Sequence, residues 1–170
     1  MMKENVAEAI NYQIKLEEES SRLYLAMASW ADTNGFPGTA AFLYKHSDEE
    51  REHQMKFIKY LNERGGHALC ASLEEPINEY NNLKEVFEQI FDHEQMITKA
   101  INTVYELAFS EKDFNTCQFL QWFLMEQDEE EALFGSILDK LNLVGNKDNS
   151  LYHFDDFLAK KAGDITVEES

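Results

Sequence analysis

The chain has 170 residues, enough for one domain with a sizeable core, and 44% of them are hydrophobic, as in globular proteins. Its 33 acidic and 15 basic residues give a formal net charge of −18, which argues against nucleic acids and anionic membranes as partners and favours cations. Only 2 prolines and 7 glycines interrupt a composition rich in helix-forming residues, which predicts an all-α fold.

Hydrophobic periodicity predicts four long helices and a short fifth one. In chain order they are expected at about 5–33, 39–64, 82–110, 113–144 and 151–162, with a polar tail over 163–170. Asn5 is the expected N-cap of the first helix, and the Gly65–Gly66 pair ends the second. Asn82, with Glu85 three residues later, and Asp113 are the expected N-caps of the third and fourth helices.

The lengths of the connections predict the topology. The loops after the first and third helices are short, so each joins antiparallel neighbours. The connection over 65–82 has about 18 residues and can reach roughly 55–60 Å when extended, whereas a helix of about 26 residues is roughly 39 Å long. This connection can therefore run the whole length of the bundle. We expect two antiparallel helix pairs, joined by a crossover, in one domain over residues 1–170.

The sequence also gives an expectation about the cellular compartment. The segment MMKENVAEAI lacks the apolar core of a signal peptide, and the longest apolar run, LYLAMASWA, is too short to span a bilayer. Cys70 and Cys117 are isolated, without a C-x-x-C pair, so neither a zinc ribbon nor a disulfide framework is expected. These features predict a protein of the reducing cytoplasm.

Each long helix carries polar residues on the stripe that should face the core. On the second helix this stripe reads Leu43, His46, Glu50, His53, Phe57 and Tyr60. The stripes of the other three helices are interrupted in the same way near their midpoints. In antiparallel packing the midpoints come to similar heights, so the interrupting side chains should converge. They are Glu17, Glu50, His53, Glu94, Gln127 and Glu130.

The charge of this group indicates a metal centre. Burying an unpaired carboxylate costs several kcal/mol, and neither Lys nor Arg lies on these stripes. The four carboxylates together carry a charge that matches two divalent cations, and His53 and Gln127 add neutral donors. Oxygen-rich ligation with one imidazole suits Fe or Mn better than a thiolate-type zinc site. A single such residue is usually solvated, but six at one level predict a di-metal centre that Glu50 is placed to bridge.

The segments that carry these residues resemble those of the bacterial non-haem ferritins over nearly the whole chain. The matching segments are LEEESSRLYLAMASW, AAFLYKHSDEEREH, HEQMIT and FLQWFLMEQDEEEALF. The resemblance implies a ferritin-like four-helix bundle with a long crossover and a short fifth C-terminal helix. It also implies that Glu17, Glu50 and His53 hold a first iron. A second iron would be held by Glu94, Glu130 and the bridging Glu50.

The resemblance further implies a third iron site and supporting residues. The third site matches Glu49, Glu126 and Glu129, with Glu130 shared. Without the resemblance, these three residues are equally well explained as a solvated acidic edge.

Three more side chains are placed next to the centre by the same resemblance. Gln127 would contact or orient the centre, and Tyr24 would support it together with Trp122, although both aromatic residues are equally well explained as ordinary core residues. His46 lies one turn away from the level of the centre, where a core histidine held by hydrogen bonds is favoured over a ligand. The other three of the five histidines, His67, His93 and His153, are expected in loops or on the surface.

Departures from related patterns narrow the expectation. Many di-iron bundles have two Glu-x-x-His motifs, but the second motif here is Gln127-x-x-Glu130. Bacterioferritins keep the second Glu/His pair and use a Met beside the first motif's His as a haem ligand. Glu52 occupies that position here, so no haem is expected. DNA-protecting mini-ferritins place their ligands between subunits, and rubrerythrins usually carry a cysteine module that this chain lacks.

The implied function is iron storage and detoxification. A ferroxidase of this kind oxidises Fe²⁺ to Fe³⁺ with O₂ (or H₂O₂) and keeps the product as ferric oxo-hydroxide mineral inside a homo-oligomeric 24-mer cage, with the fifth helix at the fourfold axes. Two alternatives stay open. One is another di-metal carboxylate oxidoreductase, manganese catalase-like or rubrerythrin-like, and the other is a metal-free acidic bundle that binds a partner protein.

Overall fold

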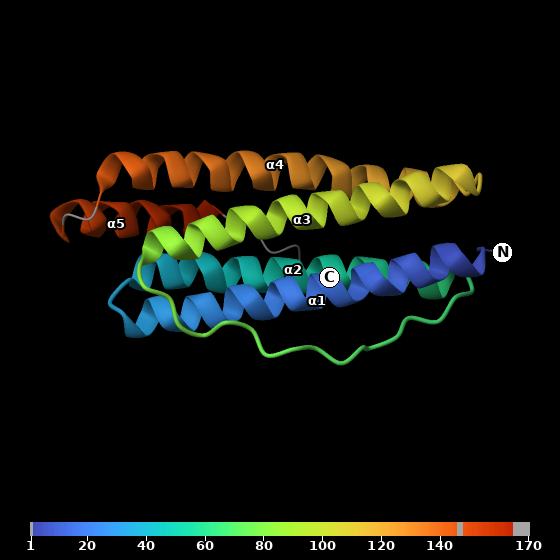
Figure 1. Ribbon diagram of the computed structural model, residues 1–170, viewed down its shortest axis with the longest axis horizontal. Coiled ribbons are helices and arrows are strands. Elements are labelled where there is room, and N and C mark those ends of the chain that lie inside the picture. The colour runs from blue at the N-terminus through green and yellow to red at the C-terminus, as the bar shows by residue number, and fades with distance from the viewer. Residues whose placement is uncertain (1, 146–147, 165–170) are drawn as a thin grey trace.

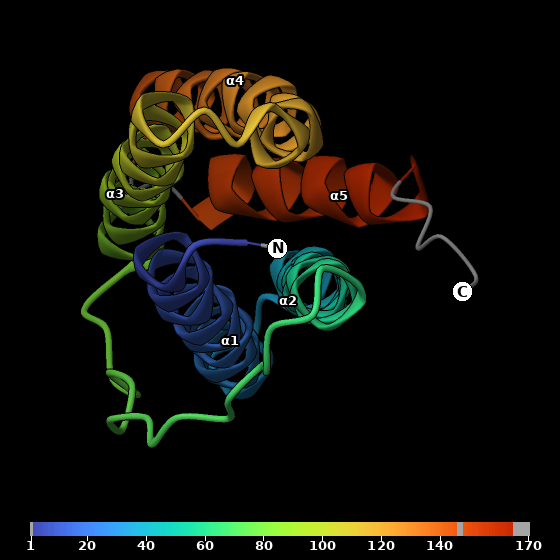
Figure 2. The ribbon, with the colours of Figure 1, turned by 90° about the vertical axis from the view of Figure 1, so that its right-hand side faces the viewer.

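The computed structural model describes residues 2–145 and 148–164, and these form five helices. They are α1 (Glu4–Thr33), α2 (Pro37–Glu63), α3 (Leu83–Ser110), α4 (Phe114–Val144) and α5 (Asp148–Asp164). The first four run side by side along the long axis, and α5 lies across one end of them (Figures 1 and 2). The predicted fold is confirmed. In the described part of the chain, none of the helices is long and apolar enough to cross a membrane.

Local chemistry sets most of the helix ends. Asn82 caps α3 by accepting a hydrogen bond from the Glu85 backbone N–H at 3.0 Å, and Asp113 caps α4 in the same way, as predicted. The predicted cap at Asn5 is wrong, because α1 already begins at Glu4. Helix α2 begins two residues earlier than expected, at Pro37, whose fixed φ suits the first turn of a helix.

The two hairpin turns close with the same backbone motif. Gly35, after α1, has a φ of 84°, and the N–H of the next residue donates to the Ala31 carbonyl at 2.9 Å. Lys112, after α3, has a φ of 58°, and the next N–H donates to the Ala108 carbonyl at 2.8 Å. One left-handed residue followed by a bond back across the last turn stops a helix and reverses the chain. Each of these helix pairs is therefore antiparallel.

The connection between α2 and α3 is the expected crossover. It runs along α1 from one end of the bundle to the other (Figure 1). Near its start, the Asn11 side chain donates to the His67 carbonyl at 3.1 Å and accepts from the Leu69 N–H at 2.8 Å. Near its end, Tyr80 packs edge-on against Trp30, with ring centroids 5.6 Å apart. The crossover is therefore fixed to α1 at both ends.

Helix α5 is tied to the start of α2 by a buried carboxylate. Asp155 accepts hydrogen bonds from the backbone N–H groups of Gly38 at 2.8 Å and Thr39 at 2.7 Å. These N–H groups have no partner within α2, so Asp155 acts as a cap supplied by another helix. A Cβ on Gly38 would lie only 2.1 Å from the Asp155 carbonyl oxygen, so this close approach requires glycine.

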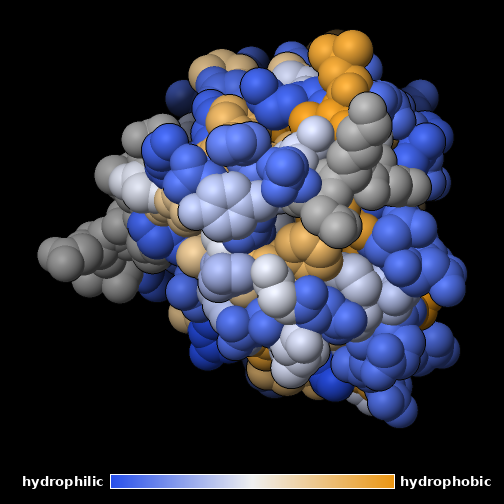
Figure 3. Space-filling view, turned by 90° about the vertical axis from the view of Figure 1, so that its left-hand side faces the viewer, coloured by the Kyte–Doolittle hydropathy of each residue, from blue (hydrophilic) through white to orange (hydrophobic). Residues whose placement is uncertain are grey.

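The bounds of α5 differ from the prediction. It begins three residues before and ends two residues after the expected 151–162. Residues 163–164 of the expected polar tail therefore belong to the helix, and 165–170 lie outside the described residues. On the surface of the end of the molecule where α5 lies, hydrophobic side chains are interspersed with hydrophilic ones (Figure 3).

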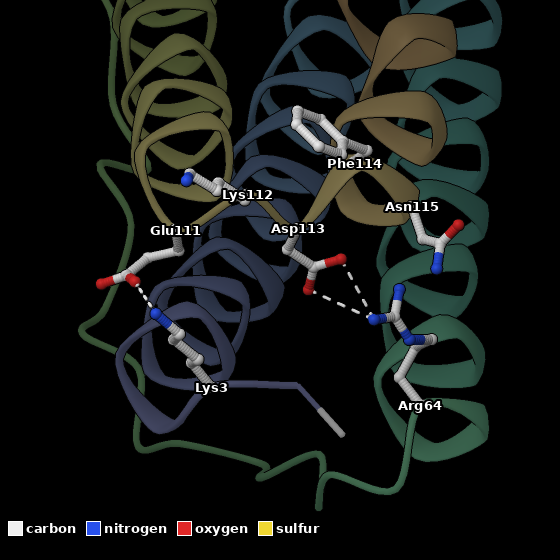
Figure 4. A pocket seen from close by; sticks show the side chains of 7 residues that line it. All are labelled: Lys3, Arg64, Glu111, Lys112, Asp113, Phe114 and Asn115. Atoms are coloured by element: carbon white, nitrogen blue, oxygen red, sulfur yellow. Dashed lines mark hydrogen bonds and ion pairs between the residues drawn. The ribbon is translucent and has the colours of Figure 1, made fainter.

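Ion pairs close the opposite end of the bundle, where Lys3 pairs with Glu111 and Arg64 with Asp113 at 3.0 Å (Figure 4). These side chains line a pocket. One of them, Arg64, follows the end of α2 and is about 14 residues after Glu50, which corresponds to roughly 21 Å at the rise of an α-helix. This pocket is therefore remote from the polar residues predicted to converge.

The hydrophobic core falls into two clusters. The cluster on the α5 side is built around Tyr24, Phe42, Phe87, Phe134, Ile137 and Phe154. The other, nearer the N-terminus, is built around Ile10, Ile14, Phe57, Leu61, Ile101 and Phe123. Within each of the helices α1 to α4, buried polar side chains lie between the residues that belong to one cluster and those that belong to the other. This polar layer is the place where a functional site is expected.

Candidate metal centre

The polar layer contains all six side chains that the sequence predicts to converge, and none is more than 5% exposed. They are Glu17 from α1, Glu50 and His53 from α2, Glu94 from α3, and Gln127 and Glu130 from α4.

One half of the layer is a compact group of three potential ligands. Glu17, Glu50 and His53 each bring one ligand atom within 4.8 Å of the others. Glu50 and His53 are three residues apart on one face of α2, and His53 Nδ1 lies 3.4 Å from Glu50 Oε2. Gln13, one turn before Glu17, donates its Nε2 to Glu17 Oε1 at 2.7 Å. Two carboxylates and an imidazole at these separations fit a divalent cation such as iron.

In the other half, Glu94 is held by donors from two helices. The Tyr24 hydroxyl donates to Glu94 Oε1, and Gln127 Nε2 donates to Glu94 Oε2 at 3.0 Å. Gln127 Nε2 also lies 3.3 Å from the Thr98 hydroxyl. The amide of Gln127 therefore orients Glu94, as hydrogen-bonding partners behind a metal ligand do.

Glu130 is less completely bonded. Its Oε2 is buried and has no hydrogen-bond partner among the described residues. His46 Nε2 lies 3.8 Å from this oxygen. The other nitrogen of His46, Nδ1, lies 3.0 Å from the Phe42 carbonyl oxygen, so the hydrogen bond expected of this buried histidine is present, while Nε2 points toward Glu130.

Burial gives the carboxyl groups of the layer a strong preference for the neutral form. It raises the pKa of Glu17, Glu50 and Glu130 well above the ordinary value, and neighbouring carboxylates raise each one further. The pKa of Glu94 is also raised by burial, in spite of its two hydrogen-bond donors. Metal cations can replace the protons, so we expect metal binding to release protons.

The residues expected to form a third site are only partly brought together. Glu49 and Glu126 join His53 in a group whose ligand atoms lie within 4.8 Å of one another. Burial raises the pKa of Glu49, and the nearby Glu126 carboxylate adds to the shift. Glu129 is exposed and is not part of this group.

The remaining predicted residues lie close to the centre or on the surface. The ring centroid of Trp122 is 5.4 Å from that of His53. His67 and His153 are exposed, as predicted. The prediction for His93 is wrong: it is half-buried on α3, and its Nε2 lies 2.7 Å from the Ser20 hydroxyl of α1. Contact between α1 and α3 covers this position, which the single-helix pattern did not show.

Sequence reasoning also missed Gln13. This residue is completely buried and bonds Glu17 from one helical turn away. A usable indication was present, because a polar residue four positions before Glu17 falls on the same stripe of the helix.

Comparisons with known proteins agree with this geometry. The family model of the ferritin-like domain matches residues 7–144. The chain is 48% identical over 155 residues to a probable bacterial non-haem ferritin-like protein of Haemophilus influenzae, covering 91% of this chain and 94% of the relative. It is 42% identical over 158 residues to a bacterial non-haem ferritin of Campylobacter jejuni, covering 93% and 95%.

A solved structure extends the likeness to three dimensions. An open-pore ferritin from Archaeoglobus fulgidus superposes with a TM-score of 0.92 at 39% identity, covering 94% of this chain and 98% of that one. Fold, buried carboxylate layer and sequence likeness lead to one conclusion: the chain belongs to the ferritin family, among the bacterial non-haem ferritins.

Proposed function

We propose that this protein stores and detoxifies iron, and that it is a ferroxidase with its centre in the polar layer. One observation carries the proposal: four carboxylates and an imidazole from four different helices are buried at one level between two hydrophobic clusters. A layer of this kind is costly for a protein that binds no cation. It is well suited to a protein whose substrate is Fe²⁺.

The proposed roles follow the geometry. Glu17, Glu50 and His53 bind the first Fe²⁺, since their ligand atoms already lie within 4.8 Å of one another. Glu94 and Glu130 bind the second, and Glu50 is shared. Each Fe²⁺ gives one electron to O₂, which takes up two protons and leaves as H₂O₂, so that two Fe³⁺ result. Two irons held together let O₂ accept both electrons in one encounter.

The protein's own groups prepare this reaction. Hydrogen bonds from Gln13, Tyr24 and Gln127 fix two of the carboxylates before iron arrives. Fixed ligands lose little freedom when the metal binds, which favours rapid loading. Protons held by the buried carboxyl groups leave on loading, and anionic oxygen ligands then favour Fe³⁺ over Fe²⁺. No haem takes part in this proposal.

A third iron position is proposed at Glu49 and Glu126, with Glu129 as the more exposed ligand. Glu49 is half-buried, and Glu129 is open to solvent. A more open position is suited to moving iron between the centre and the store. We expect it to contribute little to the first oxidation of two irons.

Storage requires a hollow assembly, and the surface has apolar side chains that an assembly would cover. Tyr12 and Leu25 on α1 are 59% and 50% exposed, and Leu143 and Tyr152, at the end of α4 and on α5, are 89% and 71% exposed. Large apolar side chains at these levels of exposure favour contacts between copies. We propose a 24-mer cage that acts in the cytoplasm.

Native mass and Fe²⁺-dependent O₂ uptake, measured on the same sample, test this function. We expect a mass close to 24 times 19.8 kDa, with O₂ consumed on addition of Fe²⁺. A stable monomer that oxidises Fe²⁺ would indicate a different di-metal carboxylate enzyme. A protein that neither binds Fe²⁺ nor takes up O₂ would indicate a metal-free interaction protein.

A further inference from the structure

A second group of potential ligands lies beside the proposed centre. It consists of His46, Glu49 and Glu130, each of which brings one ligand atom within 4.8 Å of the others. His46 and Glu130 are buried, and Glu49 is half-buried. The direction of each donor atom decides what such a group can bind.

The imidazole of His46 is held so that one ring nitrogen faces the two carboxylates. Its Nδ1 lies 3.0 Å from the Phe42 carbonyl oxygen, which can only accept, so Nδ1 carries a hydrogen. In the neutral ring, Nε2 then presents a lone pair. The ring packs against Phe42 and Phe134, with centroid separations of 4.3 and 5.2 Å. These contacts fix the ring plane, so the lone pair has a set direction, as in many histidine ligands.

The oxygen that faces this lone pair, Glu130 Oε2, is not hydrogen-bonded to any residue that the structure describes. His46 Nε2 lies 3.8 Å from Glu130 Oε2, which is too long for a hydrogen bond. Glu130 is only 5% exposed, and its Oε2 is without a hydrogen-bond partner within the described residues. A lone pair and a buried carboxylate oxygen repel each other unless something positive lies between them. A cation about 2.0–2.2 Å from each atom fits a gap of this length.

We propose that His46, Glu49 and Glu130 form an additional divalent-cation site, in which His46 supplies the nitrogen ligand. One imidazole and two carboxylates suit Fe²⁺, Co²⁺ or Zn²⁺. The site rests on the proposed function in one respect, because Glu130 is shared with the proposed centre. Glu49 is shared in turn with the proposed third position. A cation bound at His46 therefore lies between the proposed centre and the proposed third position.

Crystals of the full-length protein soaked with Zn²⁺ test this site directly. Zn²⁺ accepts the same donors and undergoes no redox change. We expect an anomalous-difference peak at bonding distance from His46 Nε2, separate from a peak at Glu17, Glu50 and His53. Both peaks are read from one map. Density at the centre with none at His46 overturns this inference alone, whereas density at His46 with an empty centre supports it and contradicts the proposed function.

A variant tests the same site in solution. In His46→Asn, the amide N–H can still donate to the Phe42 carbonyl, but the Nε2 lone pair is lost. Equilibrium dialysis without O₂ should show either one Zn²⁺ fewer per chain or a lower affinity for the weakest ion, because the site loses its nitrogen ligand. His67→Asn, the same change on the exposed crossover, should bind Zn²⁺ like the unmodified protein. Unchanged binding by His46→Asn overturns the inference. It would indicate that a proton on Glu130, and not a cation, lies between His46 Nε2 and Glu130 Oε2. If this variant does not fold, the zinc map decides.

Discussion

Gln127 on α4 donates its amide Nε2 to Glu94 Oε2 on α3 at 3.0 Å, across the polar layer. The Tyr24 hydroxyl of α1 donates to the other oxygen of the same carboxylate. Glu94 is thus fixed from two sides, while Glu130, on the same helix as Gln127, has an oxygen that no described residue hydrogen-bonds. In the proposed centre, one ligand of the second iron is therefore set before binding, and the other is free to adjust.

Replacing Gln127 with leucine should weaken the binding of the second iron. The side chain keeps a similar volume but loses the donor that orients Glu94, and loss of such a partner costs about 10–100-fold in metal affinity or activity. Anaerobic Fe²⁺ titration should show the weaker second site. Gln121→Leu, an exposed change on the same helix, serves as control and should titrate like the unmodified protein. Equal affinities in both variants would show that Gln127 does not orient Glu94.

Gly38→Ala should release α5 from the start of α2. The new Cβ would lie 2.1 Å from the Asp155 carbonyl oxygen, so the two helices must separate and the cap supplied by Asp155 must weaken. Losing a cap alone costs about 0.5–2 kcal/mol. Thermal unfolding and native mass should both reveal the change.

Gly163→Ala is the matched control for this experiment. It is the same substitution on α5, and its Cβ would meet no atom within 4 Å. In a helix, alanine is favoured over glycine by about 0.8–1.0 kcal/mol. The control should therefore be as stable as the unmodified protein or slightly more stable. Equal melting temperatures for the two variants would contradict the close packing at Gly38.

The metal-free protein should lose stability as the pH rises, because of its buried carboxyl groups. Burial raises the pKa of Glu130 well above 4.5. Below that ordinary pKa the carboxyl group is protonated in both the folded and the unfolded chain. As the pH rises further, the unfolded chain gives up its proton first, so the free energy of unfolding falls. Glu130→Gln removes this dependence at one position.

Histidine titration has the opposite sign and must be separated from this effect. Burial lowers the pKa of His46 from 6.5 to about 4, so His46 adds stability as the pH rises through that range. Both Glu130→Gln and the unmodified protein contain His46. The contribution of His46 to stability therefore cancels to first order when the two proteins are compared. The melting temperature of the variant, relative to the unmodified protein, should increase between about pH 5 and 8 in the presence of a chelator. A constant difference would contradict the raised pKa of Glu130.

Replacing Glu49, Glu126 and Glu129 together with glutamine should leave the first oxidation event intact. These residues form the proposed third position, outside the group of Glu17, Glu50 and His53. Rapid mixing with two Fe²⁺ per chain should give the normal fast phase, whereas later additions should show altered turnover and a changed iron-to-oxygen ratio. Loss of the first phase would place these residues in the primary centre. Normal behaviour throughout mineralisation would identify them as a solvated acidic edge.

Much of the fold could be predicted because its determinants are local. The stops at Gly65–Gly66 and the caps at Asn82 and Asp113 depend on neighbours a few residues away, and the crossover follows from its length. The cap that Asp155 supplies to α2 could not be predicted in this way. Its partners lie 116 and 117 residues earlier in the chain, and no periodic pattern links them.

The same distinction applies to the candidate site. The positions of Glu17, Glu50 and Glu94 could be predicted because a polar residue on the core-facing stripe is recognised from the spacing of residues within one helix. The half-buried position of His93 depends on how α1 and α3 meet at Ser20, which is a property of two helices packed together. The open oxygen of Glu130 likewise depends on the exact position of a side chain on another helix.

The central claim, that the polar layer is a ferroxidase centre, is tested most directly by stopped-flow oxidation of Fe²⁺ in Glu50→Ala. Glu50 is the proposed bridge between the two irons, and it is only 3% exposed. With two Fe²⁺ per chain, the unmodified protein and Glu63→Ala, an exposed change on the same helix, should show a fast phase with O₂ uptake. Glu50→Ala should lose that phase while keeping its helical content and its assembly. A fast phase at the unmodified rate in Glu50→Ala would contradict the assignment of the centre.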